Sequence, residues 1–188
     1  IHDTQIALAM LGEGLQVGYQ KALQLMLAST SCNGLSLGVA KDAGVKDIKD
    51  LKGKRVGFVV GAPALNQNAL AVIAYGGLTR ADVKIVEFSN YGAMWKGMVN
   101  NEVDAAFAST ISGQAREVDS SPRGLVWPPA PGGDKAAWAR VQKVGPYFYP
   151  HQTTCGAGGL SGRASPPTWQ EPWHDIPVAD PAVDPAPA

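Results

Sequence analysis

The chain has 188 residues, of which 45% are hydrophobic and 17% are charged, so it can form the core of one domain or two small lobes. Its 16 Lys and Arg residues balance 16 Asp and Glu residues, and this zero net charge argues against nucleic acid or an anionic membrane as a partner. The apolar runs are far shorter than the ~20 residues that a membrane-spanning helix needs.

The first 46 residues mix several short elements. The pattern predicts a helix over residues 4–11 behind Asp3, which is a favoured N-cap residue. Strands are predicted at residues 22–28 and 35–40, joined by a polar turn. No signal-peptide pattern precedes them, which is compatible with a signal peptide having been removed.

A complete strand–loop–helix unit occupies residues 47–78. Residues 56–60 form a continuous apolar run, as expected for a strand buried on both faces of a parallel sheet. Pro63 suits the first turn of the helix that follows, and Gly76-Gly77 ends it. A strand that leads into an open helix N-terminus can hold an anion.

The alternation of strand and helix continues to about residue 145. Strands are predicted at residues 83–88, 103–108 and 124–127, and helices at residues 91–99, 109–118 and 134–144. The second helix of this series is expected to be capped by Ser109 or Thr110, and the first by Ser89 or Asn90. This order predicts an α/β fold with a mainly parallel sheet and helices on both faces.

Three strand-to-helix loops, residues 61–68, 89–91 and 109–112, should meet at the carboxyl edge of the sheet, where α/β proteins bind ligands. They contain no His, Cys, Asp or Glu, so they offer hydrogen bonds but no general acid or base. The candidate ligand-binding residues are those of the loops and one nearby aromatic residue: Gly61, Ala62, Pro63, Ala64, Asn66, Gln67, Asn68, Tyr91, Ser109, Thr110 and Trp127.

Each candidate also has a purely structural interpretation. The loop after Val60 can be an ordinary connection, and Ser109 and Thr110 can be helix caps only. Tyr91 and Trp95 stand at positions i and i+4, which is typical of a packing pair. Trp127 can be a core or hinge aromatic residue.

Four stretches in order carry a resemblance to a known family: D-L-K-G-K-R-V at 50–56, the small-residue loop at 61–68, G-L-T-R-A-D-V at 77–83 and N-E-V-D-A-A-F at 101–107. They resemble the second lobe of the TAXI-type solute-binding proteins of TRAP transporters. The similarity extends over roughly residues 1–160 and includes VGPYFYPHQTTCGAGG, which is similar to the crossover back to the first lobe.

The resemblance implies a type II periplasmic binding protein that closes two lobes on a small organic anion, either a glutamate-like amino acid or an oxo or dicarboxylic acid. Its partner would be the TRAP permease in the membrane, and it would be periplasmic. It implies no enzyme activity, no cofactor and no metal site.

The resemblance divides the chain into four parts. Residues 1–46 are expected to be a remnant of the first lobe and its crossover, residues 47–145 the second lobe, and residues 146–162 the return crossover. Residues 163–188 hold seven of the 14 prolines and are expected to be a disordered tail. Most of the first lobe is missing, and the loop after Val60 lacks the family's usual Gly- and Ser-rich pattern, so we expect an internal fragment.

In the family fold Cys32 and Cys155 would both lie near the first lobe, so the resemblance allows a disulfide between them; two buried thiols are the alternative. Two other functions remain open. One is the ligand-sensing domain of a transcription regulator, which shares this fold. The other is an enzyme that uses Cys155 with His151 as its base, although the Gly and Thr neighbours of Cys155 do not favour a helix there.

Overall fold

The structure, a computed structural model, describes residues 34–146, 148–152, 156–158 and 167–170. The predicted helix at residues 4–11, the predicted strand at residues 22–28, and both cysteines, Cys32 and Cys155, lie outside the described residues. The described strands are β1 (Leu35–Ala40), β2 (Arg55–Val59), β3 (Lys84–Phe88), β4 (Ala105–Ser109), β5 (Leu125–Val126), β6 (Tyr149–Gln152) and β7 (Pro167–Gln170). The described α-helices are α3 (Pro63–Tyr75), α4 (Tyr91–Val99), α5 (Gly113–Ser120) and α6 (Lys135–Val144).

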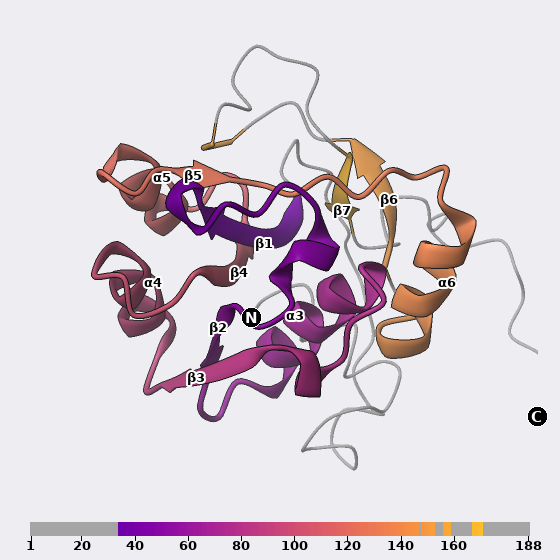
Figure 1. Cartoon of the computed structure of the whole chain (residues 1–188), viewed down its shortest axis with the longest axis horizontal. Helices are drawn as coiled ribbons and strands as arrows, with labels where there is room; N and C mark the ends of the chain where they lie inside the picture. Colours follow the sequence, from indigo (N-terminus) through magenta and orange to yellow (C-terminus); the bar gives the residue numbers. More distant parts are fainter. Residues whose placement is uncertain (1–33, 147, 153–155, 159–166, 171–188) are drawn as a thin grey trace, which may run out of the picture.

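The strands form one sheet in the order β3-β2-β4-β1-β7-β6, with β5 also paired to β1 (Figure 1). Strand β2 is parallel to both β3 and β4, whereas β1 is antiparallel to β4, β5 and β7. Strands β2, β3, β4, β5 and β7 therefore share one direction, and β1 and β6 run the other way. The predicted α/β class with a mainly parallel sheet is confirmed.

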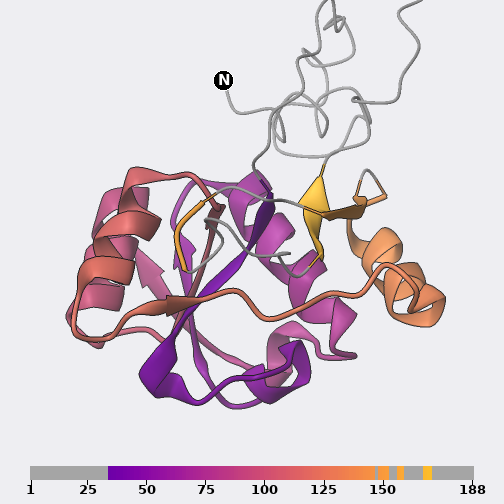
Figure 2. The ribbon, with the colours of Figure 1, turned by 90° about the horizontal axis from the view of Figure 1, so that it is seen from above.

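Two pairs of helices cover the two faces of the sheet. Helices α4 and α5 lie on one face and α3 and α6 on the other (Figure 2). Alternate strand residues serve the two cores: Phe107 of β4 packs on the α3 side and Ala106 on the α4 side. Gly57 keeps α4 close to the sheet, because a Cβ at this position would lie 2.6 Å from Met94.

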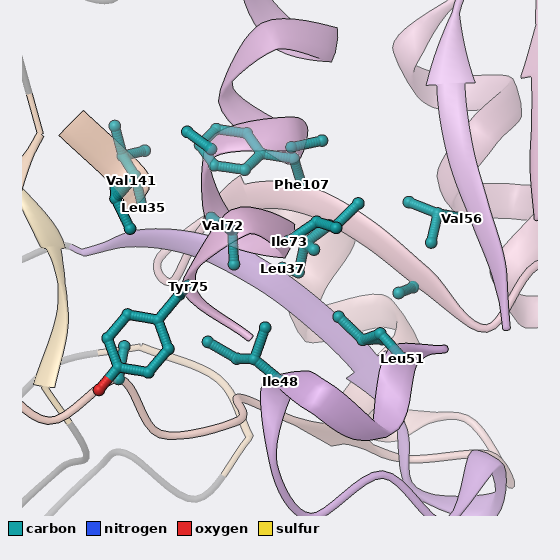
Figure 3. Packing of buried hydrophobic residues seen from close by; sticks show 14 of the residues in the cluster. Leu35, Leu37, Ile48, Leu51, Val56, Val72, Ile73, Tyr75, Phe107 and Val141 are labelled. Carbon is teal, nitrogen blue, oxygen red and sulfur yellow. The ribbon is translucent and has the colours of Figure 1, made fainter. Parts of the chain in front are cut away.

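The larger core lies between the sheet and α3 (Figure 3). Val72 and Ile73 of α3 meet side chains from three strands and from the short 3-10 helix Ile48–Leu51. Tyr75, at the end of α3, stacks edge-on against Trp138 of α6 with ring centroids 5.8 Å apart. The C-terminal end of α3 is bound by Arg140, whose side chain donates to the carbonyl groups of Ala74 and Tyr75 at 3.2 and 2.7 Å.

Strand β1 belongs to the middle of the sheet rather than to a crossover before it. It pairs with β4 from Leu35↔Ser109 to Val39↔Ala105, and all six of its residues are buried. The strand before residue 46 and the strands after it therefore belong to the same sheet. A continuous buried run needs cover on both faces, which only a central position in the sheet provides.

Two further predictions are corrected. Helix α5 begins at Gly113 and is capped by Ser112, not by Ser109 or Thr110, because β4 runs through Ser109 and the Thr110 amide continues the pairing by donating to the Gly34 carbonyl at 2.9 Å. The segment predicted as a disordered tail contains strand β7, which pairs with β6 and with Leu35 of β1. Of the alternatives for α4, Asn90 is the cap.

The amino ends of β2 and β4 are joined by ionic hydrogen bonds around Asp104. The Asp104 carboxylate accepts from the Arg55 backbone amide at 2.9 Å and from the Arg55 guanidinium at 3.1 and 2.6 Å. Its other neighbour is Arg123, which is 9% exposed and lies 3.6 Å away. Arg123 also donates to both carboxylate oxygens of Asp42, at 2.8 and 2.7 Å.

This network shifts the pKa values of its two carboxyl groups. Burial raises the pKa of Asp104, but the hydrogen bonds from Arg55 and the charges of Arg55 and Arg123 outweigh it, so the pKa lies below the usual value. The side-chain hydrogen bonds from Arg123 lower the pKa of Asp42. Both carboxylates are therefore ionised and paired in the folded state at neutral pH.

The substitution Asp104→Ala should lower the free energy of unfolding by about 3 kcal/mol, which is the lower end of the cost of removing one partner of a buried ion pair. The lower end applies because Arg123 still has its ion pair with Asp42. Urea denaturation measures this loss. The control is Glu87→Ala, which breaks the exposed 4.0 Å pair with Arg80 and should cost less than about 1 kcal/mol. Equal losses in the two variants would contradict the structural role of Asp104.

The same carboxylate should make stability depend on acid. Its folded pKa lies below the unfolded value of about 3.9, so its contribution is complete above that value and is lost as the pH falls through the folded pKa. The stability difference between the wild-type chain and Asp104→Ala should therefore shrink as the pH is lowered from 6 to about 2. Urea unfolding at a series of pH values tests this, and a difference that stays constant would be evidence against it.

The carboxyl edge of the central strands as a candidate functional site

Three strand-to-helix connections meet at the carboxyl edge of β2, β3 and β4. These strands are adjacent and parallel, and the pairs Val59↔Phe88 and Val56↔Ala105 fix their register. Each strand is followed directly by a helix: α3 after β2, α4 after β3 and α5 after β4. The predicted convergence of the loops at 61–68, 89–91 and 109–112 therefore follows from the observed sheet order.

The N-terminus of α3 differs from the other two helix starts at this edge. Ala62, at its N-cap, provides no side-chain hydrogen bond, and Pro63 stands in its first turn. By contrast, the Asn90 side chain accepts from the Ala93 amide at 2.9 Å, and the Ser112 hydroxyl accepts from the Ala115 amide at 3.1 Å. The first amides of α3 thus lack a side-chain acceptor and face the edge with the positive end of the helix dipole.

Gly61 places this helix start. Its φ of 76° is in the left-handed region, which glycine adopts at little cost. The turn begins with the Ala62 amide donating to the Val59 carbonyl at 3.2 Å, after the Val60 amide has bonded the Phe88 carbonyl of β3 at 2.9 Å. A Cβ added to Gly61 would meet no atom within 4 Å, so the backbone conformation, not crowding, calls for glycine here.

Three amide side chains predicted to contact ligand are used within the fold. Asn66 bonds both backbone groups of Val59, its Oδ1 accepting from the amide and its Nδ2 donating to the carbonyl, each at 2.9 Å. Gln67 donates to the Val144 carbonyl at 2.7 Å and so joins α3 to the end of α6. Asn68 is 1% exposed. Asn66 fixes the geometry of the loop rather than pointing into open space.

Thr110 is completely buried and joins three segments. Its hydroxyl accepts from the Gly34 amide at 3.1 Å, and its carbonyl accepts from the Ala157 amide at 2.8 Å. Ser109 lies at the end of β4, and its hydroxyl is 3.5 Å from the Ile111 amide that donates to it. Trp127 is buried, and its indole N–H donates to the Ala157 carbonyl at 3.0 Å. Thr110 and Trp127 therefore hold the sheet and the segment around Ala157 together.

Tyr91 occupies the first position of α4 and packs against Trp95, with ring centroids 6.2 Å apart. Burial raises the pKa of its hydroxyl, against smaller opposite effects of Ser112 and Trp95. The hydroxyl is therefore neutral at physiological pH and can take part in hydrogen bonds only. The predicted packing pair is confirmed.

Sequence reasoning missed two exposed apolar side chains at this edge. Val60 is 63% exposed and Ile111 is 40% exposed, and they are the exposed large hydrophobic residues of the described part of the chain. Val60 comes directly after β2, and Ile111 lies just beyond the end of β4. The sequence held one sign of the exposure of Val60: it is the last apolar residue before the turn at Gly61. In the structure it follows the last residue of β2, Val59.

The loops of this edge offer hydrogen-bonding groups rather than carboxylate, imidazole or thiol groups. The loops supply backbone amides, hydroxyl groups and two apolar side chains, and no His, Cys, Asp or Glu. Within the described ranges, no group of three or more His, Cys, Asp or Glu residues could hold a metal ion. Among those same residues no helix is long and apolar enough to cross a membrane.

Several solved structures are similar to parts of this chain. The alkanesulfonate-binding protein SsuA from Xanthomonas axonopodis pv. citri, bound to MOPS, is 30% identical over 38% of this chain and 24% of that chain, with a TM-score of 0.33. The desulfurization enzyme DSZB is 17% identical over 40% of this chain and 36% of its own, with a TM-score of 0.33. Substrate-binding domain 2 of Lactococcus lactis GlnP is 16% identical over 60% of this chain and 50% of that chain, with a TM-score of 0.37.

The chain thus covers between a quarter and a half of the length of these proteins. Among curated proteins, none shows significant similarity to it. A family model described as NMT1/THI5 like matches residues 15–133, which is more than half of the chain and includes β1 to β5 with all three loops of the carboxyl edge. The chain belongs to the NMT1/THI5-like family.

Proposed function

We propose that this chain is part of an extracytoplasmic solute-binding protein and that the carboxyl edge of β2, β3 and β4 captures a small organic anion for a membrane permease. The observation that carries the proposal is the N-terminus of α3, which lacks a side-chain cap while its two neighbours at the same edge have one. An anion there would accept hydrogen bonds from the first amides after Pro63, which no side chain caps, and would be stabilised by the helix dipole.

The residues proposed to contact the ligand lie at the start of α3, at the start of α4 and at the end of β4. They are the backbone of Gly61, Ala62, Pro63 and Ala64, together with the side chains of Tyr91 and Ser109. Asn66, Gln67, Thr110 and Trp127 act behind them, since their side chains bond to protein groups. Asn68 is buried in α3 and is placed with this second group.

The described lobe offers one wall of such a site. In a solute-binding protein a second wall closes over the ligand, and the bound solute shifts the population toward the closed form. The exposed side chains of Val60 and Ile111 suit this role, because they can be buried when the cleft closes on the ligand.

The glutamate-like, oxo-acid and dicarboxylate ligands and the TRAP permease remain predictions from the resemblance of the sequence to TAXI-type proteins. The similarity to an alkanesulfonate-binding protein adds sulfonates to the anions worth testing. A thermal-shift panel of glutamate, 2-oxoglutarate, C4 dicarboxylates and alkanesulfonates tests the ligand class. A compound at 100 times its dissociation constant should stabilise the chain by roughly 2.7 kcal/mol.

The substitution Ala62→Asp should affect stability and binding in opposite directions. Its carboxylate would cap α3 and interact with the dipole, which stabilises the fold by about 1 kcal/mol. The same carboxylate would accept the hydrogen bonds of the first amides of α3, and its negative charge would repel an anion. The thermal shift caused by an anionic ligand should therefore disappear. Urea denaturation and the thermal-shift panel measure the two effects in the same protein.

The matched control is Ala136→Asp, which adds the same charge to the exposed first turn of α6, a helix that Asp134 already caps. This variant should keep the anion-dependent shift. A shift that survives in Ala62→Asp, or that vanishes equally in both variants, would show that the start of α3 is not the anion site.

A further inference from the structure

Trp95 carries an unusual buried polar group. Its side chain is 1% exposed, and its Nε1 is buried without a hydrogen-bond partner among the residues that the structure describes. Leaving a buried N–H donor unpaired costs about 1–3 kcal/mol. By contrast, the indole N–H of Trp127 donates to the Ala157 carbonyl at 3.0 Å, and that of Trp138 donates to the Pro131 carbonyl at 3.1 Å. Trp95 is thus the exception that calls for an explanation.

The orientation of the indole ring places this N–H toward the carboxyl edge. The distal ring carbon Cη2 lies against the middle of β1, 3.1 Å from where a Cβ of Gly38 would be. The nitrogen, which is the sole polar side-chain atom of Trp95, lies close enough to the Tyr91 hydroxyl, at the first position of α4, to lower the pKa of that hydroxyl, but the pair does not have the geometry of a hydrogen bond. Tyr91 is half-buried and packs against the buried Trp95 ring at the end of α4 that follows β3.

The polar side chains gathered there are an indole N–H and two hydroxyl groups, with no carboxylate among them. Trp95 can only donate, and the Tyr91 and Ser112 hydroxyls can each donate one hydrogen. Ser112 already accepts a hydrogen bond from the Ala115 amide. A hydrogen bond between Tyr91 and Ser112 uses one of the two hydroxyl hydrogens, and the indole N–H is not paired with either hydroxyl oxygen in the observed geometry. None of the three loops contributes an Asp or Glu that could accept from them or pair with an ammonium group.

We propose that the Trp95 N–H is a ligand-binding donor beneath Tyr91, which takes an oxyanion group of the solute when the Tyr91 side chain moves aside. This inference rests on the proposed function and extends it. The solute is an organic oxyanion, a carboxylate or a sulfonate, without an ammonium group to be paired at this edge. Because the Nε1 atom has no exposed surface, movement of the tyrosine is part of binding.

The test follows indole N–H resonances by NMR in the full chain labelled with 15N-tryptophan and 15N-alanine. The Trp95 signal is assigned from its through-space contacts to Tyr91, and the probes are 1-butanesulfonate and pentanoate, with butylammonium as the cationic control. The anions should move the Trp95 signal downfield in a saturable way. The signals of Trp127 and Trp138 should stay in place, because their hydrogen bonds are already made.

A second measurement needs no ligand. Tyr91→Ala should speed hydrogen exchange of the Trp95 N–H and leave that of Trp138 unchanged, because only the former loses its cover. If the anions shift the Ala64 amide but not the Trp95 indole, the inference is wrong and the proposed anion site stands. If neither signal moves, both fail for this class of solute. A shift caused by butylammonium, or unchanged exchange in Tyr91→Ala, also overturns the role of Trp95.

Discussion

The buried carboxylate of Asp104 is the constraint on which the rest of this structure depends. It joins β2 to β4 through the Arg55 amide and guanidinium and lies beside the buried Arg123. The Asp104 backbone adds two more links, since its amide donates to the Arg55 carbonyl and its carbonyl accepts from the Ala40 amide at the end of β1, each at 2.9 Å. A single residue thereby fixes three adjacent strands at one edge of the sheet.

The consequence appears at the opposite edge. With the amino ends of β2 and β4 fixed by charge, the parallel register brings their carboxyl ends out together, and the loops to α3 and α5 lie next to each other. Ionic groups hold the first edge, whereas the second edge has no charged side chain in its three loops. Its polarity comes from backbone amides, hydroxyl groups and one indole N–H. Such an arrangement can attract an anion without a charged side chain that would itself need a partner.

Much of the fold could be predicted because it is encoded locally. The apolar run before Gly61, Pro63 in the first turn and the glycines after Tyr75 predict the unit from β2 to α3 within one residue. The predicted strand at residues 35–40 coincides with β1, but its central place in the sheet could not be predicted, since pairing with β4 joins residues about 70 positions apart. The same holds for β7, a short strand in a proline-rich segment that exists through its contacts with β6 and β1.

The candidate site could be placed but not detailed from sequence. The rule that ligands bind at the carboxyl ends of parallel strands gave the three loops, whereas side-chain roles depend on distant partners. Asn66 was expected to face ligand but bonds Val59, and Thr110 was expected to cap a helix but bonds Gly34. The unpaired N–H of Trp95 had no sequence signal, because the i, i+4 spacing with Tyr91 is that of an ordinary packing pair.

Hydrogen–deuterium exchange of the full chain, with and without the anion that gives the largest thermal shift, shows whether the ligand binds at the carboxyl edge of β2, β3 and β4. Amides that bind an anion exchange more slowly, because exchange requires the bound group to leave. We expect slowing concentrated in peptides that contain residues 60–66, 89–93 and 109–113, with the amino ends of β2 and β4 unchanged. Slowing around Arg55 and Asp104 instead, or none at the start of α3, would contradict the assignment of the ligand to the carboxyl edge.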